Sequence, residues 1–127
     1  MVLVKARAAQ RTLLMPLDAV QEVVLMAQLQ QVGHGHDGLD GLLDLRGTAV
    51  PVYRFGPSDV DALDELVLVA SQSDGPVGIV VSDMEVCVVD DEEVTTRTMN
   101  DGPTRFVRLD GSLHRLVDPR FEKVLDV

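Results

Sequence analysis

Two short valine-rich segments that flank a turn sequence constrain the fold of this chain more than any other feature. The first covers residues 65–71 and the second residues 77–81, and both are almost wholly apolar. The four residues 73–76 between them include a glycine and a proline, which favour tight turns. Apolar runs of this length, bounded by turn residues, are typical of strands that are buried on both faces. The pattern predicts a hairpin of two largely buried strands.

Similar short segments recur along the chain. A second hairpin is predicted around Asp110-Gly111, the dipeptide expected of a type I′ turn. Asp18 is expected to cap one helical turn over residues 19–22, and a continuous helix over residues 18–31 is the alternative. A short helix is expected to begin at Asp118-Pro119, since proline is tolerated in a first helical turn. Strands are predicted at residues 2–8, 11–16, 23–26, 48–55, 84–89, 105–109 and 112–117.

The composition also favours strands. Hydrophobic residues make up 46% of the 127 residues but aromatic residues only 3%, so valine and leucine must fill the interior. β-branched valine suits strands better than helices. The length fits a single domain over residues 1–127, or two small subdomains that share a core. We expect the break between such subdomains near residues 56–65, where Gly56 and Pro57 precede an acidic segment.

Arg46 is the residue that most restricts the function of the chain. It follows an apolar run and precedes Gly47, where the chain is expected to bend and enter a strand. A buried arginine must find partners, because burying an unpaired charge is costly. One interpretation is that an internal carboxylate holds Arg46, with Asp40, Asp44 and the region of Glu22 as candidates. The other is that its guanidinium meets a partner protein at a groove, and the two roles are compatible because a held arginine is preorganised.

The charge excludes some classes of partner. The formal net charge is −10, whereas phosphate backbones and anionic lipids are bound by clustered lysine and arginine. We therefore expect neither nucleic acid binding nor membrane insertion. No apolar run approaches the roughly 20 residues of a membrane span, and the N-terminus lacks the pattern of a signal peptide. The single cysteine, Cys87, fits a reducing compartment, so we expect a cytoplasmic protein.

The sequence offers no catalytic motif. No Gly-x-Ser-x-Gly motif surrounds any serine, so Ser82 and His114 are not expected to act as parts of a hydrolase site. His34, His36 and Asp37 on a glycine-rich loop are the best candidates for metal ligands. Zinc needs three or four converging ligands with supporting hydrogen bonds, and no further partner cluster is evident. We therefore expect no enzyme activity, no cofactor and no metal.

Three blocks of sequence, together with the two predicted hairpins, carry a resemblance to a known family. They are Val-Gln-Glu at residues 20–22, Leu-Arg-Gly at residues 45–47 and Val-Gly-Ile-Val-Val at residues 77–81. In this order and spacing, and with the hairpin that ends near residue 118, the chain resembles the CheW-like domain over nearly its whole length. The CheW-like domain is the small adaptor of bacterial chemosensory arrays.

The resemblance implies both a fold and a function. The fold would be all-β with little helix: two intertwined five-stranded SH3-like β-barrels around a shared core, with a short C-terminal helix. The function would be that of a non-enzymatic adaptor. It would couple the cytoplasmic tip of a methyl-accepting chemoreceptor to the regulatory domain of a CheA-type histidine kinase, in the cytoplasm at the periphery of receptor arrays.

The resemblance also implies which residues face the partners. Val20 and Glu22 match receptor-facing positions, and Gly41 and Arg46 match positions across the groove between the barrels. We expect Val20 at the interface and Val23 in the core. The kinase contact is expected mainly on the second barrel, without residues assigned to it.

Some positions depart from the family pattern. Asp44 stands where the family usually has asparagine, residues 33–37 replace a loop that often contains proline, and residues 95–104 replace a longer insertion. These departures concern the identity of the partners more than the fold. They leave an alternative function open: a divergent CheW-like scaffold that regulates motility or cell polarity through a small GTPase or a response regulator.

Overall fold

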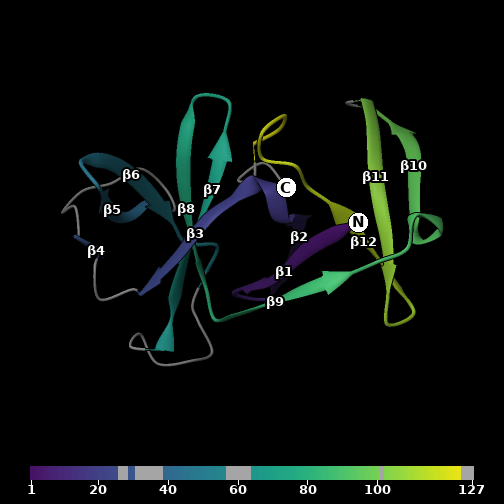
Figure 1. Cartoon of the computed structure of the whole chain (residues 1–127), viewed down its shortest axis with the longest axis horizontal. Coiled ribbons are helices and arrows are strands. Elements are labelled where there is room, and N and C mark those ends of the chain that lie inside the picture. The colour runs from purple at the N-terminus through teal and green to yellow at the C-terminus, as the bar shows by residue number, and fades with distance from the viewer. Residues whose placement is uncertain (26–28, 31–38, 57–63, 101, 124–127) are drawn as a thin grey trace.

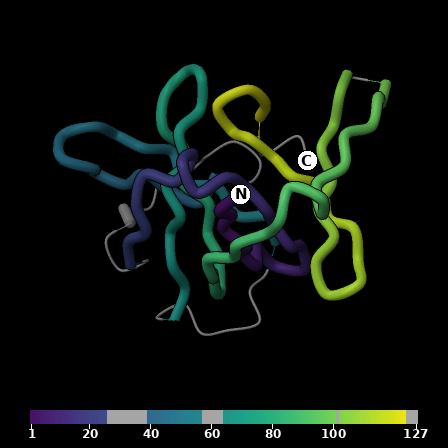
Figure 2. Tube along the Cα trace, turned by 45° about the vertical axis from the view of Figure 1, so that its right-hand side comes forward, coloured from purple at the N-terminus to yellow at the C-terminus, as the bar shows by residue number. Residues whose placement is uncertain are grey.

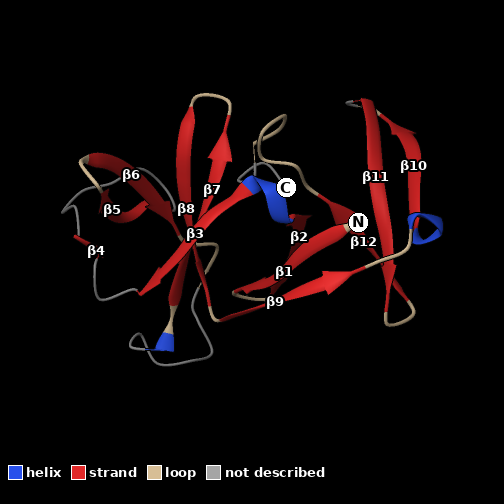
Figure 3. Ribbon diagram, viewed as in Figure 1, coloured by secondary structure: helices blue, strands red, loops and turns tan. Residues whose placement is uncertain are grey.

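Nearly all regular structure in this protein is β (Figure 3). The computed structural model describes residues 1–25, 29–30, 39–56, 64–100 and 102–123. Helical structure in these residues is confined to short 3₁₀ turns, among them η1 (Leu17–Ala19) and η4 (Asp91–Glu93). The twelve strands of the described residues are β1 (Val2–Ala8), β2 (Arg11–Pro16), β3 (Val20–Leu25), β4 (Leu29–Gln30), β5 (Leu39–Leu45), β6 (Thr48–Tyr53), β7 (Leu66–Gln72), β8 (Gly75–Val81), β9 (Asp83–Val88), β10 (Val94–Met99), β11 (Gly102–Leu109) and β12 (Ser112–Leu116).

These strands form two six-stranded sheets (Figure 1). Sheet A has the order β10-β11-β12-β2-β1-β9, and sheet B has the order β3-β7-β8-β6-β5-β4. Neighbouring strands pair antiparallel except for β12 with β2 and β6 with β8, which are parallel. The expected all-β fold is therefore confirmed, with six strands in each sheet where five were expected.

The path of the chain interlocks the two sheets. Strands β1 and β2 belong to sheet A, β3 to β8 to sheet B, and β9 to β12 to sheet A again, so the first and last strands lie in the same sheet (Figure 2). The chain changes sheet between β2 and β3 and again between β8 and β9. The break expected near residues 56–65 is flanked by β6 and β7, which both lie in sheet B, and residues 57–63 lie outside the described residues.

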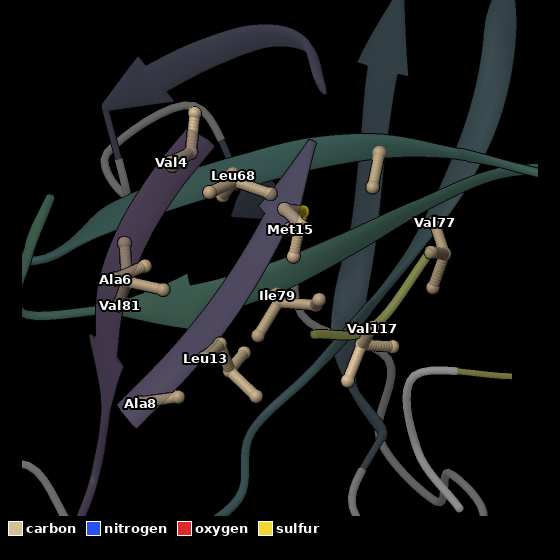
Figure 4. Packing of buried hydrophobic residues seen from close by; sticks show 11 residues of the cluster. Val4, Ala6, Ala8, Leu13, Met15, Leu68, Val77, Ile79, Val81 and Val117 are labelled. Carbon is tan, nitrogen blue, oxygen red and sulfur yellow. The ribbon is translucent and has the colours of Figure 1, made fainter. Parts of the chain in front are cut away.

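Three apolar clusters hold this arrangement together. One lies within sheet B and is built from β5 to β8, and one lies within sheet A and includes residues of β1, β2, β11 and β12. The third is shared between the sheets, because side chains of β1 and β2 point toward side chains of β7 and β8 (Figure 4). This shared core comprises Val4, Ala6, Ala8, Leu13, Met15, Leu68, Ala70, Val77, Ile79, Val81 and Val117.

The β7–β8 hairpin is buried on both faces, as its sequence predicts. Val67 and Val69 pack into the sheet B cluster, whereas Leu68 and Ala70 pack into the shared core. Alternating side chains of one strand therefore serve two different cores. This arrangement explains why the segment is continuously apolar instead of alternating with polar residues.

Gly78 of β8 lies opposite Val52 of β6 in the parallel pair. A Cβ atom at Gly78 would lie 2.8 Å from Cγ2 of Val52 and 2.9 Å from Cγ1 of Val67. Both valines are fully buried and β-branched, so neither side chain can turn away freely. We expect the Gly78→Ala variant to lose about 1–3 kcal/mol of unfolding free energy through overpacking, measured by urea denaturation.

A second substitution checks the cause of that loss. Val52→Ala removes one of the two crowding side chains, so the Gly78→Ala/Val52→Ala variant should lose less stability than the sum of the single losses. Additive losses would show that crowding between these strands is not the reason for glycine at this position.

Two tight turns have the backbone geometry of type I′ hairpins. Asp110 and Gly111 between β11 and β12 have φ values of 51° and 81°, which confirms the predicted turn. Arg46 and Gly47 between β5 and β6 have φ values of 50° and 88°. Positive φ is unfavourable for a residue such as arginine, so Arg46 occupies a strained backbone position.

Two local predictions are corrected. The segment after Asp18 is not a helix: η1 covers Leu17–Ala19 and β3 begins at Val20, so both the helical turn over 19–22 and the alternative helix over 18–31 are wrong. The chain after β12 forms a turn instead of the expected helix, with backbone N–H groups of Phe121 and Glu122 bonded to the Asp118 carbonyl. Residues 124–127 lie outside the described residues.

The Asp118 side chain explains why this end of the chain is compact. Its carboxylate is nearly buried and accepts hydrogen bonds from Nε and Nη2 of Arg120, at 2.9 and 2.8 Å. The bonds from Arg120 lower the pKa of Asp118 below its ordinary value, against the opposing effect of burial. In return, the Glu122 carboxylate accepts the backbone N–H of Asp118 at 3.0 Å, so the polar groups of the turn satisfy one another.

Candidate protein-interaction site

An ion pair joins the β5–β6 turn to the edge strand β3. Nη2 of Arg46 donates to Oε2 of Glu22 at 2.7 Å. The two residues are 24 positions apart, so this contact is made by the fold and not by local sequence. The structure thus brings together two of the four expected partner-facing residues.

Arg46 is not the buried arginine that its apolar neighbours suggested. Its side chain is 74% exposed, whereas that of Glu22 is 28% exposed. The turn places Arg46 outside the apolar strands on either side of it, which removes the need for internal partners. Among the internal partners considered, the region of Glu22 proves correct, while Asp44 accepts the backbone N–H of Gly47 at 2.8 Å and so stabilises the turn.

Val20 lies at the start of β3, half-buried against the shared core. The register of β3 with β7 shifts between Val20 and Glu22, which leaves Gln21 as an extra residue in a β-bulge. The Gln21 amide donates to Oγ of Ser71 at 2.9 Å and so holds the bulge from outside. Besides Val20, Val24 of this strand packs against a core, that of sheet B, whereas Val23, which was expected in the core, belongs to none of the three clusters.

Gly41 is buried in β5, where it pairs with Val52 of β6. It is separated from Arg46 by five positions along nearly straight chain, or about 16 Å. The structure therefore does not place Gly41 beside the Glu22–Arg46 pair. Gly41 instead follows a second β-bulge, because the register of β5 with β6 shifts between Leu39 and Gly41.

The arginine that carboxylates do hold inside the domain is Arg54, which the sequence reasoning missed. Its Nη1 and Nη2 atoms donate to the two carboxylate oxygens of Glu65 at 2.6 and 3.0 Å. Its Nε and Nη2 atoms also reach Asp40, at 3.3 and 3.4 Å. Glu65 is only 3% exposed, and its hydrogen bonds raise the pKa of the Arg54 guanidinium above the ordinary value. We call Arg54, Glu65 and Asp40 the Arg54 clamp.

An apolar strip on the edge of sheet A was also not predicted. It consists of Val2, Val86 and Val88, which are all exposed, Val88 to 79%. Val88 pairs with Val2 and Val86 with Val4, so the strip continues the face that carries the shared core. Alternation along residues 84–89 could have revealed it, because every second residue there is apolar in a strand that lies at a sheet edge.

The remaining candidate chemistry is sparse. The three residues considered as metal ligands, His34, His36 and Asp37, lie outside the described residues. In the part of the chain that is described, no three His, Cys, Asp or Glu side chains gather as metal ligands would. Burial, with the nearby Glu85, raises the pKa of the Cys87 thiol, which disfavours the reactive thiolate. None of the described helical segments has the length and apolar character needed to cross a membrane.

Comparison with known proteins agrees with the geometry. The crystal structure of the scaffolding protein TtCheW from Thermoanaerobacter tengcongensis has a similar fold, with a TM-score of 0.70. The similarity covers 94% of this chain and 84% of that chain at 15% sequence identity. No curated protein matches this sequence. The family model of the CheW-like domain matches residues 2–121. This chain therefore belongs to the CheW-like domain family.

Proposed function

We propose that this chain is a chemosensory adaptor that couples the cytoplasmic tip of a chemoreceptor to the regulatory domain of a CheA-type histidine kinase. Membership of the CheW-like domain family supports the adaptor class. The observation that carries the proposal is the Glu22–Arg46 pair, in which a strained, exposed arginine is held ready at a turn. The positive φ of Arg46 is the one that the type I′ turn requires, and the bond from Gly47 to Asp44 fixes the turn that presents the side chain.

The receptor-facing surface of this adaptor is centred on Val20, Glu22 and Arg46, whereas Gly41 is a buried residue of β5. The side chain of Glu22 remains partly accessible, and that of Arg46 mostly accessible. A partner can therefore contact either charge without first breaking a buried pair. The apolar strip of Val2, Val86 and Val88 offers the kind of uncharged area that protein interfaces combine with a polar rim.

Each of these contacts is small, so we expect modest affinity for any single partner. Adaptors in arrays gain strength from many linked contacts, because linkage raises effective concentration without making one interface tight. We place the protein in the cytoplasm, at the periphery of the receptor array.

Reversing the charge of Arg46 tests the receptor surface. We expect Arg46→Glu to weaken binding to receptor-tip fragments from the same organism at least about tenfold, since arginines at interfaces often contribute more than 1 kcal/mol. Stability should change little, because the lost pair is exposed. Titration of labelled receptor-tip fragments with each variant gives the affinities.

A matched reversal provides the control. Arg108 is an exposed arginine on β11 of sheet A, so Arg108→Glu changes net charge equally and should retain receptor binding. Binding of the kinase regulatory domain should survive in the Arg46→Glu variant. If the unmodified protein binds no regulatory domain of any chemosensory kinase from its organism, the proposed coupling function is wrong, and a screen against small GTPases and response regulators becomes the next experiment.

A further inference from the structure

The β5–β6 hairpin is fastened at both ends by arginine–carboxylate contacts. At its turn, Arg46 reaches Glu22 of β3. At its open end, Arg54 directly follows β6 and reaches Glu65, which directly precedes β7. Strands β3 and β7 pair with each other. Glu22 lies opposite Val69 near one end of this pair, and Leu25 lies opposite Leu66, the residue after Glu65, at the other end. The hairpin is thus held at opposite ends of one strand pair.

The Glu22–Arg46 pair and the Arg54 clamp differ in how easily their ion pairs can separate. The pair at the turn is exposed, and water can replace either partner at little cost. In the Arg54 clamp, Glu65 is almost fully buried and both its oxygens are bound by one planar guanidinium. Separating these charges would strand a buried carboxylate. The clamp therefore remains closed when the outer pair opens, and it holds the open end of the hairpin together with the pairing of β6 with β8 and the sheet B core.

The clamp also fixes the β-bulge before Gly41. Asp40 is the extra residue between the pairs Leu39 with Tyr53 and Gly41 with Val52. Its carboxylate bonds to Nε and Nη2 of Arg54, which is the residue after Tyr53. The side chain that defines the bulge is thus tied to the neighbouring strand. A one-residue slip of register would turn the side chains that follow to the opposite face.

We propose that Arg54 is a positioning residue for the interaction surface. By holding Asp40 and Glu65 together, it fixes the register of β5 and so the position from which Arg46 is presented to a partner. This inference rests on the proposed function, in which Arg46 meets the receptor. It assigns to Arg54, which lies away from the outer pair, a role in binding as well as in stability.

Two variants open the clamp in different ways. Asp40→Ala releases the bulge and leaves the buried Arg54–Glu65 pair intact. Arg54→Met/Glu65→Met removes the buried pair as a unit and leaves only the partly exposed Asp40 without its arginine, so the protein should stay folded. We expect each to weaken binding to receptor-tip fragments about tenfold, as substitutions remote from a ligand can. Adding Asp40→Ala to the double variant should weaken binding no further, because Asp40 acts through Arg54.

A matched control changes the same residue types elsewhere. Arg108→Met/Glu92→Met removes one arginine and one glutamate from exposed positions in β11 and η4, and should bind like the unmodified protein. Wild-type affinity in both clamp variants would overturn the proposal. Additive losses from Asp40→Ala and the double variant would also overturn it, because Asp40 would then contact the partner directly.

A second measurement needs no partner. Backbone amide NMR signals of Gly41 and Arg46 should shift in both clamp variants and not in the control. If the unmodified protein binds no receptor tip, the proposed function fails, and these signals alone decide the positioning role. Unchanged signals at Gly41 and Arg46 would overturn it.

Discussion

Replacing Arg54 by methionine is expected to lower the free energy of unfolding by about 3–5 kcal/mol. The substitution leaves the Glu65 carboxylate buried without the fork that now binds both its oxygens. The cost arises from the stranded charge more than from the lost attraction. Domains of this size are stable by only about 5–15 kcal/mol, so the variant should unfold at a much lower urea concentration.

A double variant distinguishes the cost of the unpaired Glu65 charge from the loss of its attraction to Arg54. In Arg54→Met/Glu65→Met the buried charge is absent, so most of the lost stability should return. Arg108→Met, at an exposed position, should change stability by no more than about 0.5 kcal/mol. If Arg54→Met were as stable as the unmodified protein, the clamp would not be a structural element. If the double variant were no better than the single one, the cost would not come from the unpaired carboxylate.

Leu68→Ala is expected to cost about 2–5 kcal/mol, because the fully buried side chain would leave a cavity in the shared core. The shared core joins β1 and β2 to β7 and β8, so the loss should weaken both sheets together (Figure 4). Leu25→Ala is the matched control: this leucine lies on β3 but is 57% exposed, and its loss should cost far less.

Two probes show whether the sheets unfold as one unit. Fluorescence of the single tyrosine, Tyr53 in β6, reports on the shared core against which it packs, and far-UV circular dichroism reports on all strands. The two urea transitions should coincide in the unmodified protein and in Leu68→Ala. Transitions that separate in the unmodified protein would mean that the shared core does not couple the sheets.

The features that the sequence predicts correctly are those determined by neighbouring residues. The β7–β8 hairpin follows from a continuous apolar run with a turn inside it, and the type I′ turn follows from Asp110-Gly111. The segment after Asp18 was harder, because a capping residue before an apolar run suits a helix as well as the short turn that precedes β3. There, pairing of β3 with β7 decides the structure, and that pairing is not local.

In the candidate site too, contacts between distant residues were harder to predict than features set by neighbouring residues. Arg46 was expected to be buried because its neighbours are apolar, but apolar neighbours do not show on which side of a turn a side chain lies, and the side chain is exposed. In the Arg54 clamp, Arg54 contacts Glu65, 11 positions away, and Asp40, 14 positions away. Asp40 lies in a β-bulge, which no residue type in the sequence predicts. A usable signal existed: Arg54 and Glu65 are charged residues at the ends of two apolar strands, with opposite charges.

The interlocked path of the chain has a consequence for how the protein is made. Sheet B is built from one continuous stretch, β3 to β8, and can pair as soon as residue 81 has left the ribosome. Sheet A cannot close then, because β2 waits for β12, about a hundred residues later in the chain. Until then the face of the β1–β2 hairpin that carries Leu3 and Leu14 lacks the strands β11 and β12 that cover it, and apolar surface exposed in this way is prone to aggregate. The order of synthesis therefore predicts that this hairpin keeps one apolar face exposed until the last strand is made.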